Sequence, residues 1–158
     1  MPTVLIPMTM EMTITTYLKS DPSLVAATPG GIYEYTALGR IGITREEMPE
    51  AYDTDGYVMP LLVVKARAPV PTNGMSDELE KRTAQLQFVE VWMYQWVGYD
   101  KIEIIDRNVY RLLQFHRFPG FTPFAWNYST GPQQDNGALN GASVIMKDYM
   151  TRAVVVPV

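Results

Sequence analysis

Two segments of the chain repeat apolar residues at the three- and four-residue spacing of a helix. In residues 9–19, one face carries Met10, Ile14, Tyr17 and Leu18. In residues 100–113, the apolar stripe consists of Ile102, Ile105, Val109, Leu112 and Leu113. Asp100 precedes Glu103 by three residues, which predicts a capping box at the start of the second segment. The sequence therefore predicts two main amphipathic helices.

A shorter helix is predicted directly after the first one. Asp21 can accept a hydrogen bond at an N-cap, and Pro22 suits the first helical position because its missing N–H would be unpaired there anyway. Pro29, Gly30 and Gly31 end this piece.

Five segments have the composition or alternation of strands. They are residues 32–35, 59–68, 85–96, 124–128 and 144–155. In the second of these, Leu61 to Val64 are apolar on both faces, which is typical of an inner strand, and Pro60 lies at the start, where a missing donor matters least. In the fourth, Phe124, Trp126 and Tyr128 alternate. The last two segments predict a long-tipped hairpin that closes the sheet.

The strand at residues 85–96 is apolar on both of its faces. One face carries Leu86, Phe88, Trp92, Tyr94 and Trp96, interrupted by Glu90. The other carries Val89, Val91 and Met93. One layer of helices can bury only one face of a sheet, so the second apolar face is a candidate contact surface with another subunit.

Three long connections separate these elements. Residues 45–57 are polar and contain Pro49 and an Asp-Gly pair, residues 65–84 include the charged stretch 76–84 with room for one helical turn, and residues 129–143 are rich in glycine. No internal linker divides the chain, and we expect residues 1–158 to form a single domain. The predicted fold class is α+β: a mostly antiparallel β-sheet with the two main helices packed on one face.

Composition excludes several classes of protein. The chain has a net charge of −4, which argues against general binding to nucleic acid or anionic membranes. It has no cysteine, which excludes disulfides, zinc–thiolate sites and thiol catalysis. The apolar run from Val58 to Val64 is far shorter than the roughly 20 residues that cross a bilayer. We expect a soluble protein without a targeting segment.

Candidate chemistry is sparse. His116 is the only histidine, and we interpret it as a packing or surface residue. Asp53, Asp55 and Gly56 resemble the start of a calcium loop, but Val64 stands where the bidentate Glu is required. The glycines match no phosphate-binding motif, and Glu46, Glu47 and Glu50 are typical of a solvated turn. We therefore predict no catalytic residue, no metal and no cofactor.

An aromatic set lies between residues 115 and 126. It consists of Phe115, Phe118, Phe121, Phe124 and Trp126. Such rings can stack on nucleobases, but binding platforms of that kind lie beside basic grooves, and only Arg111 and Arg117 are close. The pattern favours core packing or subunit contact, and so a structural protein over an enzyme.

The order of these elements resembles a known family. The helix with "YLKSDPSLVAA", then "GGIY", a polar turn and "MPLLVV", is similar to the beginning of tail-terminator, or tail-completion, proteins of long-tailed bacteriophages and related gene-transfer particles. "FVEVWMYQW", the helix "YDKIEIIDRNVYRLL" and the closing strand "ASVIMKDYMTRAVV" resemble the second half of that family. The three long connections depart from its typical members.

The resemblance implies a virion protein at the head–tail interface, assembled in the host cytoplasm. It implies a homo-oligomeric ring, usually of six copies, that caps the tail tube and meets the head–tail connector or a head-closure protein, without catalysis. An acidic chain suits a channel through which DNA passes without specific binding. Two alternatives remain open: another neck protein, such as a head-closure or tail-joining protein, and a small α+β ligand-binding domain or enzyme.

Nine residues are expected at subunit or ring contacts. They are Phe88, Trp92, Tyr94, Trp96, Phe124, Trp126, Gln133, Gln134 and Asn136. The loops 65–84 and 129–143 are expected to engage neighbouring rings or subunits. Deletion of residues 132–140 is expected to preserve the fold and to impair attachment.

Overall fold

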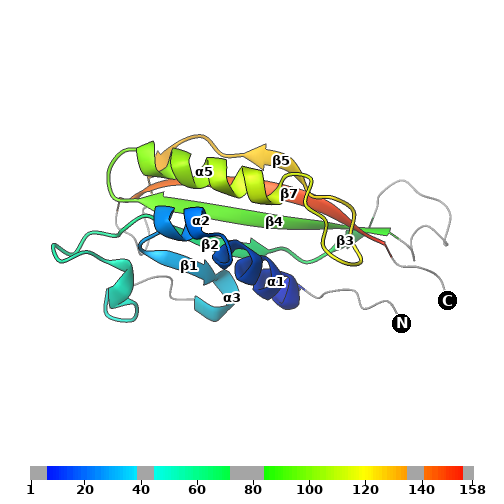
Figure 1. Ribbon diagram of the computed structural model, residues 1–158, viewed down its shortest axis with the longest axis horizontal. Helices are drawn as coiled ribbons and strands as arrows, with labels where there is room; N and C mark the ends of the chain where they lie inside the picture. The colour runs from blue at the N-terminus through cyan, green and yellow to red at the C-terminus, as the bar shows by residue number, and fades with distance from the viewer. Residues whose placement is uncertain (1–6, 39–44, 72–83, 135–140, 155–158) are drawn as a thin grey trace.

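The computed structural model describes residues 7–38, 45–71, 84–134 and 141–154. The helices in these ranges are α1 (Pro7–Lys19), α2 (Pro22–Ala27), α3 (Tyr35–Leu38), the single 3₁₀ turn η1 (Pro49–Ala51) and α5 (Asp100–Leu113). The strands are β1 (Gly31–Glu34), β2 (Leu61–Ala66), β3 (Val70–Pro71), β4 (Ala84–Gln95), β5 (Ala125–Ser129), β6 (Gln133–Gln134) and β7 (Ser143–Val154). Figure 1 shows this arrangement.

All of these strands belong to one sheet. Its order is β1-β2-β4-β7-β5, with the short strand β3 paired to β4 and β6 paired to β7. Only β1 and β2 run parallel, and the other pairs are antiparallel. The long strands β4 and β7 form the centre and pair from Ala84↔Val154 to Gln95↔Ser143. The α+β class and the mostly antiparallel sheet are confirmed.

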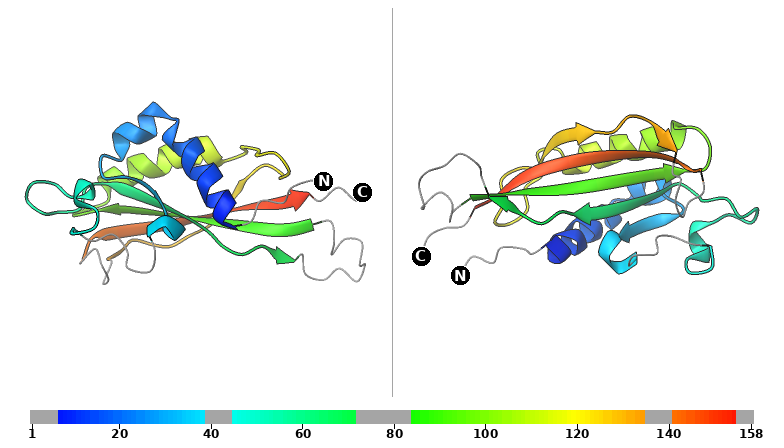
Figure 2. Two further views of the ribbon diagram at one scale, coloured as in Figure 1. Left: turned by 90° about the horizontal axis from the view of Figure 1, so that it is seen from below. Right: turned by 180° about the vertical axis from the view of Figure 1, so that it is seen from behind.

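The helices α1, α2 and α5 lie on one face of the sheet (Figure 2, left). The main core lies beneath them and includes Ile14, Leu18, Val91, Ile105 and Val109, all fully buried. The apolar stripes of α1 and α5 were predicted from their spacing, and the structure confirms both. The two main helices therefore cover the sheet face that carries Val89, Val91 and Met93.

A buried glutamate connects α1 to the sheet. Glu11 is buried, its Oε1 accepts a hydrogen bond from the Ala66 backbone N–H at 3.0 Å, and its Oε2 accepts one from the Thr36 N–H at 3.1 Å. Both carboxylate oxygens therefore satisfy backbone donors at the end of β2 and the start of α3. This residue was not singled out in the sequence.

Asp21 caps α2 as predicted. Its Oδ2 accepts a hydrogen bond from the Leu24 N–H at 2.9 Å and lies 2.7 Å from Nη2 of Arg111 on α5. The Arg111 guanidinium and the Leu24 amide hold the pKa of the Asp21 carboxyl below its usual value. The short helix is thus joined to α5 by one aspartate.

The predicted capping box of α5 is wrong. The cap residue is Tyr99, without a side-chain cap bond, and the Oε1 of Gln95 accepts from the N–H groups of Lys101 and Ile102 at 2.8 and 2.9 Å. The Nε2 of Gln95 donates to Asp100 Oδ1 at 2.8 Å, which lowers the pKa of Asp100. A side chain from the end of β4 performs the capping, and spacing within the helix cannot reveal that.

Several predicted boundaries also change. Tyr35 begins α3, where the sequence predicted a strand through that residue. Gln133 and Gln134 pair with Val144 and Ser143, so residues 129–143 are not all loop. The stretch 76–84 lies outside the described residues except for Ala84, which starts β4.

The alternation predicted around β5 is interrupted. Trp126 pairs with Tyr149 and Tyr128 with Asp148, with a register shift between Trp126 and Tyr128. Tyr149 and Asp148 are neighbours in β7, so their partners lie on opposite faces of the sheet. The hairpin that closes the sheet is confirmed, but the rings of Trp126 and Tyr128 do not share one face.

Candidate interaction surface

The sheet face opposite α1, α2 and α5, here called the open face, is built from matched cross-strand rows. Val63, Trp92 and Met146 form one row, and Leu61, Tyr94 and Val144 form the next. Phe88 lies opposite Met150 further along β4. Because side chains alternate along a strand, all of these point away from the helices. The aromatic face predicted for β4 is therefore the open face.

The segment 45–60 covers one end of the open face. Ala51 and Val58 are buried there together with Leu61 and Val63. The ring of Tyr57 stacks on Trp96, with 4.7 Å between ring centroids and 22° between their planes. The polar connection predicted at 45–57 thus carries a small second core, which its charged composition did not indicate.

Among the described helices, only the short helix α3 reaches the rest of the open face, through Tyr35. Phe88, Trp92 and Tyr94 are half-buried, and Trp92 and Tyr94 pack against the small core of Ala51, Val58, Leu61, Val63 and Ala142. A hollow of about 230 Å³ lies there, lined by Tyr35, Val63, Lys65, Trp92 and Tyr94. Figure 2 (left) shows α1, α2 and α5 on the other side of the sheet. An apolar surface of this kind is typical of a protein contact.

A charged row crosses the middle of the open face. Lys65, Glu90 and Asp148 are paired across β2, β4 and β7. Lys65 Nζ lies 3.9 Å from Glu90 Oε2, and Arg67 Nη2 lies 2.9 Å from Asp148 Oδ2. The Asp148 side chain is only 3% exposed and also accepts a hydrogen bond from Asn127 Nδ2 at 2.9 Å. The carboxylates are thus compensated by cations on the same surface.

Both cations of this row also contact aromatic rings. Lys65 Nζ lies 4.6 Å from the centroid of Tyr35, and Arg67 Cζ lies 4.5 Å from that of Phe88. Such contacts hold the long side chains flat against the sheet. The open face therefore combines aromatic rings with paired charged groups.

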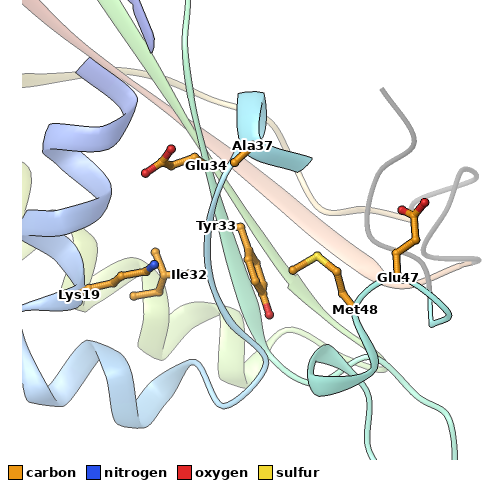
Figure 3. A pocket seen from close by; sticks show the side chains of 7 residues that line it. All are labelled: Lys19, Ile32, Tyr33, Glu34, Ala37, Glu47 and Met48. Atoms are coloured by element: carbon orange, nitrogen blue, oxygen red, sulfur yellow. The ribbon is translucent and has the colours of Figure 1, made fainter. Parts of the chain in front are cut away.

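A second hollow, of about 410 Å³, lies at the β1 edge of the sheet. Figure 3 shows its lining, with Tyr33 and Met48 facing one another and Lys19 and Glu34 at the sides. Burial raises the pKa of Tyr33, whose hydroxyl donates to the Gly30 carbonyl. These groups do not form an acid–base pair or a nucleophile with its base.

The residues considered for chemistry have structural roles. His116 stacks on Tyr17 at 4.2 Å between centroids and meets the edge of Phe118 at 4.5 Å, so the packing interpretation is confirmed. Asp53 Oδ1 accepts from the N–H groups of Asp55 and Tyr57 at 2.9 Å each, which forms a turn, as predicted. Within the described ranges, no group of three or more His, Cys, Asp and Glu residues could hold a metal.

The structure separates the nine predicted contact residues. Phe88, Trp92, Tyr94 and Trp96 lie together on the open face. Phe124 is fully buried in the main core, edge-on to Phe118, so its place on a contact surface is corrected. Its backbone is bonded to the turn after α5, which draws the ring inward.

Of the remaining predicted contact residues, Trp126 lies on the helix-covered face, because it pairs with the core residue Tyr149, and Gln133 lies on the open face, because it pairs with Val144. Trp126 is exposed near α5, where Lys147 lies 5.2 Å from its ring centroid and also pairs with Asp106 of α5. Gln133 and Gln134 are exposed in β6. Asn136 lies outside the described residues.

Sequence reasoning missed the exposed ring of Phe115 as a separate feature. Phe115 has a φ of 62° and its side chain is 75% exposed, whereas the sequence grouped it with buried phenylalanines. Hydrophobic periodicity identifies residues of helices and strands, not residues of turns. The one sequence signal for Phe115 is therefore its position just after the predicted helix.

No protein-family model matches this chain, and no curated protein is significantly similar to it in sequence. In the part of the chain that the structure describes, no helix is long and apolar enough to cross a membrane.

Proposed function

We propose that this chain is a structural protein whose identical copies close into a ring of the tail-terminator type. The ring, of six copies by the resemblance, caps the tail tube of a long-tailed bacteriophage or related particle and joins it to the head connector or head-closure protein. DNA passes through its channel without specific binding. Its place is the virion neck, after assembly in the host cytoplasm.

The observation that carries this proposal is the open face. Phe88, Trp92 and Tyr94 are half-buried there, and the described helices α1, α2 and α5 lie on the other face. Among the residues that the structure describes, the segment 45–60, Tyr35 and Ala142 pack at this surface and leave Trp92 and Tyr94 half-buried, and a neighbouring copy can cover the rest. Contacts between two different surfaces of identical copies close into a ring when the rotation divides a full turn.

Two further features support this function. The order of helices and strands matches the order on which the family resemblance rests. The net charge of −4 suits a channel for DNA, because phosphates are not held by an acidic wall. A positive potential along the pore would contradict this part of the proposal.

The decisive experiment measures the mass of the purified chain by light scattering and locates it in intact particles by imaging. We expect a closed oligomer several times the mass of one chain, placed between head and tail. Trp92→Glu is expected to abolish the oligomer, because it puts a charge in the centre of the open face. Met12→Glu, an exposed position on α1, is the matched control.

The outcomes separate the alternatives. A location elsewhere in the neck favours a head-closure or tail-joining protein. A monomer that binds a small molecule in the hollow beside Tyr33 and Met48 would overturn the ring and favour a ligand-binding domain.

A further inference from the structure

Phe115 has an unusual conformation for a large residue. Its φ of 62° is in the left-handed region, which glycine or asparagine normally occupies. Hydrogen bonds fix it there: the Phe115 N–H donates to the Phe124 carbonyl at 2.8 Å, and the Phe124 N–H donates to the His116 carbonyl at 2.8 Å. The strained backbone directs a ring that is 75% exposed into solvent. Strain of this kind is concentrated at functional positions.

A second exposed ring lies beside this turn. The Trp126 N–H donates to the side-chain oxygen of Gln114 at 2.8 Å, and the Trp126 side chain is 47% exposed. Phe115 and Trp126 together are here called the aromatic knob. The segment that carries Phe115 follows α5 on the helix-covered side of the sheet (Figure 2, left). The knob and the open face are therefore on opposite sides of the molecule.

The charges around the knob and around the open face are complementary. Residues 107–117 contain three arginines and no acidic residue; Arg111 is paired with Asp21, and Arg107 and Arg117 are exposed. Residues 45–55, which pack on the open face through Met48 and Ala51, contain five acidic residues and one arginine. Opposite charges on two surfaces direct one onto the other and exclude like-charged pairings.

The hollow on the open face suits an aromatic ring. It measures about 230 Å³ and is lined by Tyr35, Val63, Trp92 and Tyr94, with Lys65 at its edge. Its rings can pack edge-to-face against an inserted phenyl group, and the Lys65 ammonium can lie over that group. Among the described residues of one chain, the hollow has no ring inserted in it, and the exposed Phe115 ring has no pocket around it. The hollow of one copy could therefore accept the Phe115 ring of another.

We propose that the Phe115 ring of one copy inserts into the hollow on the open face of the next copy, with the arginines of 107–117 facing the acidic segment 45–55. This contact joins two different surfaces, so it repeats from copy to copy, and it closes into a ring when the rotation between copies divides a full turn. The inference rests on the proposed function and names the contact that builds the ring.

The test uses the absence of cysteine from the chain. Arg117→Cys, near the knob, and Thr36→Cys, near the hollow, are purified separately, mixed and treated with a short bismaleimide. We expect a covalent dimer only in the mixture. Met12→Cys mixed with Thr36→Cys is the control for random collision.

Replacement of Phe115 tests the knob itself. In the Arg117→Cys protein, Phe115→Gly keeps the backbone conformation and removes the ring, and we expect at least a tenfold loss of cross-linked dimer. Phe115→Tyr keeps the ring and is expected to preserve the product. Equal cross-linking with Phe115→Gly, or with the Met12→Cys control, would overturn the contact.

A charge exchange provides a second readout. Arg107→Glu is expected to weaken the assembly, and Glu50→Lys in the same chain is expected to restore it, because the two charges face each other across the contact. If the Phe115→Gly protein still forms the oligomer of the wild-type chain, the proposed Phe115 contact is wrong, but the proposed oligomeric ring is not contradicted. If the wild-type chain is monomeric at every concentration and does not cross-link, both proposals fail.

Discussion

The two faces of the sheet are built from the same strands but are completed differently. The face that carries Val91 and Met93 is buried by helices of its own chain. On the face that carries Phe88 and Trp92, the described residues that pack are the segment 45–60, Tyr35 and Ala142, and both aromatic rings stay half-buried. The first face therefore serves the stability of one chain, and we propose that the second serves contact between chains. Substitutions on the two faces should separate these effects.

The largest expected effect is on the covered face. Ile105→Ala removes a fully buried side chain of α5 and should lower the free energy of unfolding by about 2–5 kcal/mol, from lost apolar burial and the cavity that remains. Chemical denaturation measures this change. Trp92→Ala on the open face should cost the isolated chain less, despite the larger side chain. A greater loss for Trp92→Ala would reverse the comparison.

The next effect concerns the attachment of the helices to the covered face. Glu11→Ala leaves the Ala66 and Thr36 N–H groups without their acceptor, and we expect a loss of about 1–3 kcal/mol in unfolding free energy. Glu11→Gln retains one oxygen and should lose less. Hydrogen exchange of the Ala66 amide reports directly on its hydrogen bond to Glu11. If that amide is equally protected from exchange in Glu11→Ala, the hydrogen bond does not form in the wild-type protein.

A smaller effect of opposite sign is expected at the knob. Phe115→Gly relieves a left-handed conformation and should stabilise the isolated chain by up to about 1 kcal/mol. The same substitution is expected to prevent assembly. Thermal unfolding of the dilute protein and its mass at high concentration measure the two effects. If Phe115→Gly instead lowers the stability of the isolated chain, the phenyl ring of Phe115 packs within its own chain.

The smallest expected effect is on the pH dependence of the free energy of unfolding. The pKa of Asp21 is lowered in the folded state by Arg111 and the Leu24 amide, so this group stabilises the fold above its unfolded pKa. That contribution is lost as the pH falls through the lowered, folded pKa. Asp21→Asn should flatten the acid limb of the stability curve slightly, because the Arg111 side chain that lowers this pKa is 53% exposed and water screens the pair. An identical acid limb in the variant would contradict the assignment.

Local patterns predicted the elements well. The stripe of α5, the Asp21 cap and the inner position of β2 all depend on neighbouring residues, and the structure confirms each of them. The two faces of β4 were also predicted, because alternation assigns them directly. What the sequence could not supply were contacts between distant residues.

Three such contacts account for the differences. Gln95 caps a helix that begins five residues later, and the bulge between Trp126 and Tyr128 is defined only by its pairing with β7. Phe124 lies in the core because its backbone is bonded to the turn at Phe115 and His116. The candidate site was therefore half predicted: the aromatic face was found, and the exposed ring on the opposite side was not.

The central claim is that another copy covers the open face, and footprinting with hydroxyl radicals tests it most directly. Side-chain oxidation of Trp92 and of Met12 is compared at low and high protein concentration. We expect Trp92 to become protected as the oligomer forms, while Met12, exposed on α1, reacts equally in both states. Unchanged oxidation of Trp92 in an oligomer of confirmed mass would contradict the claim.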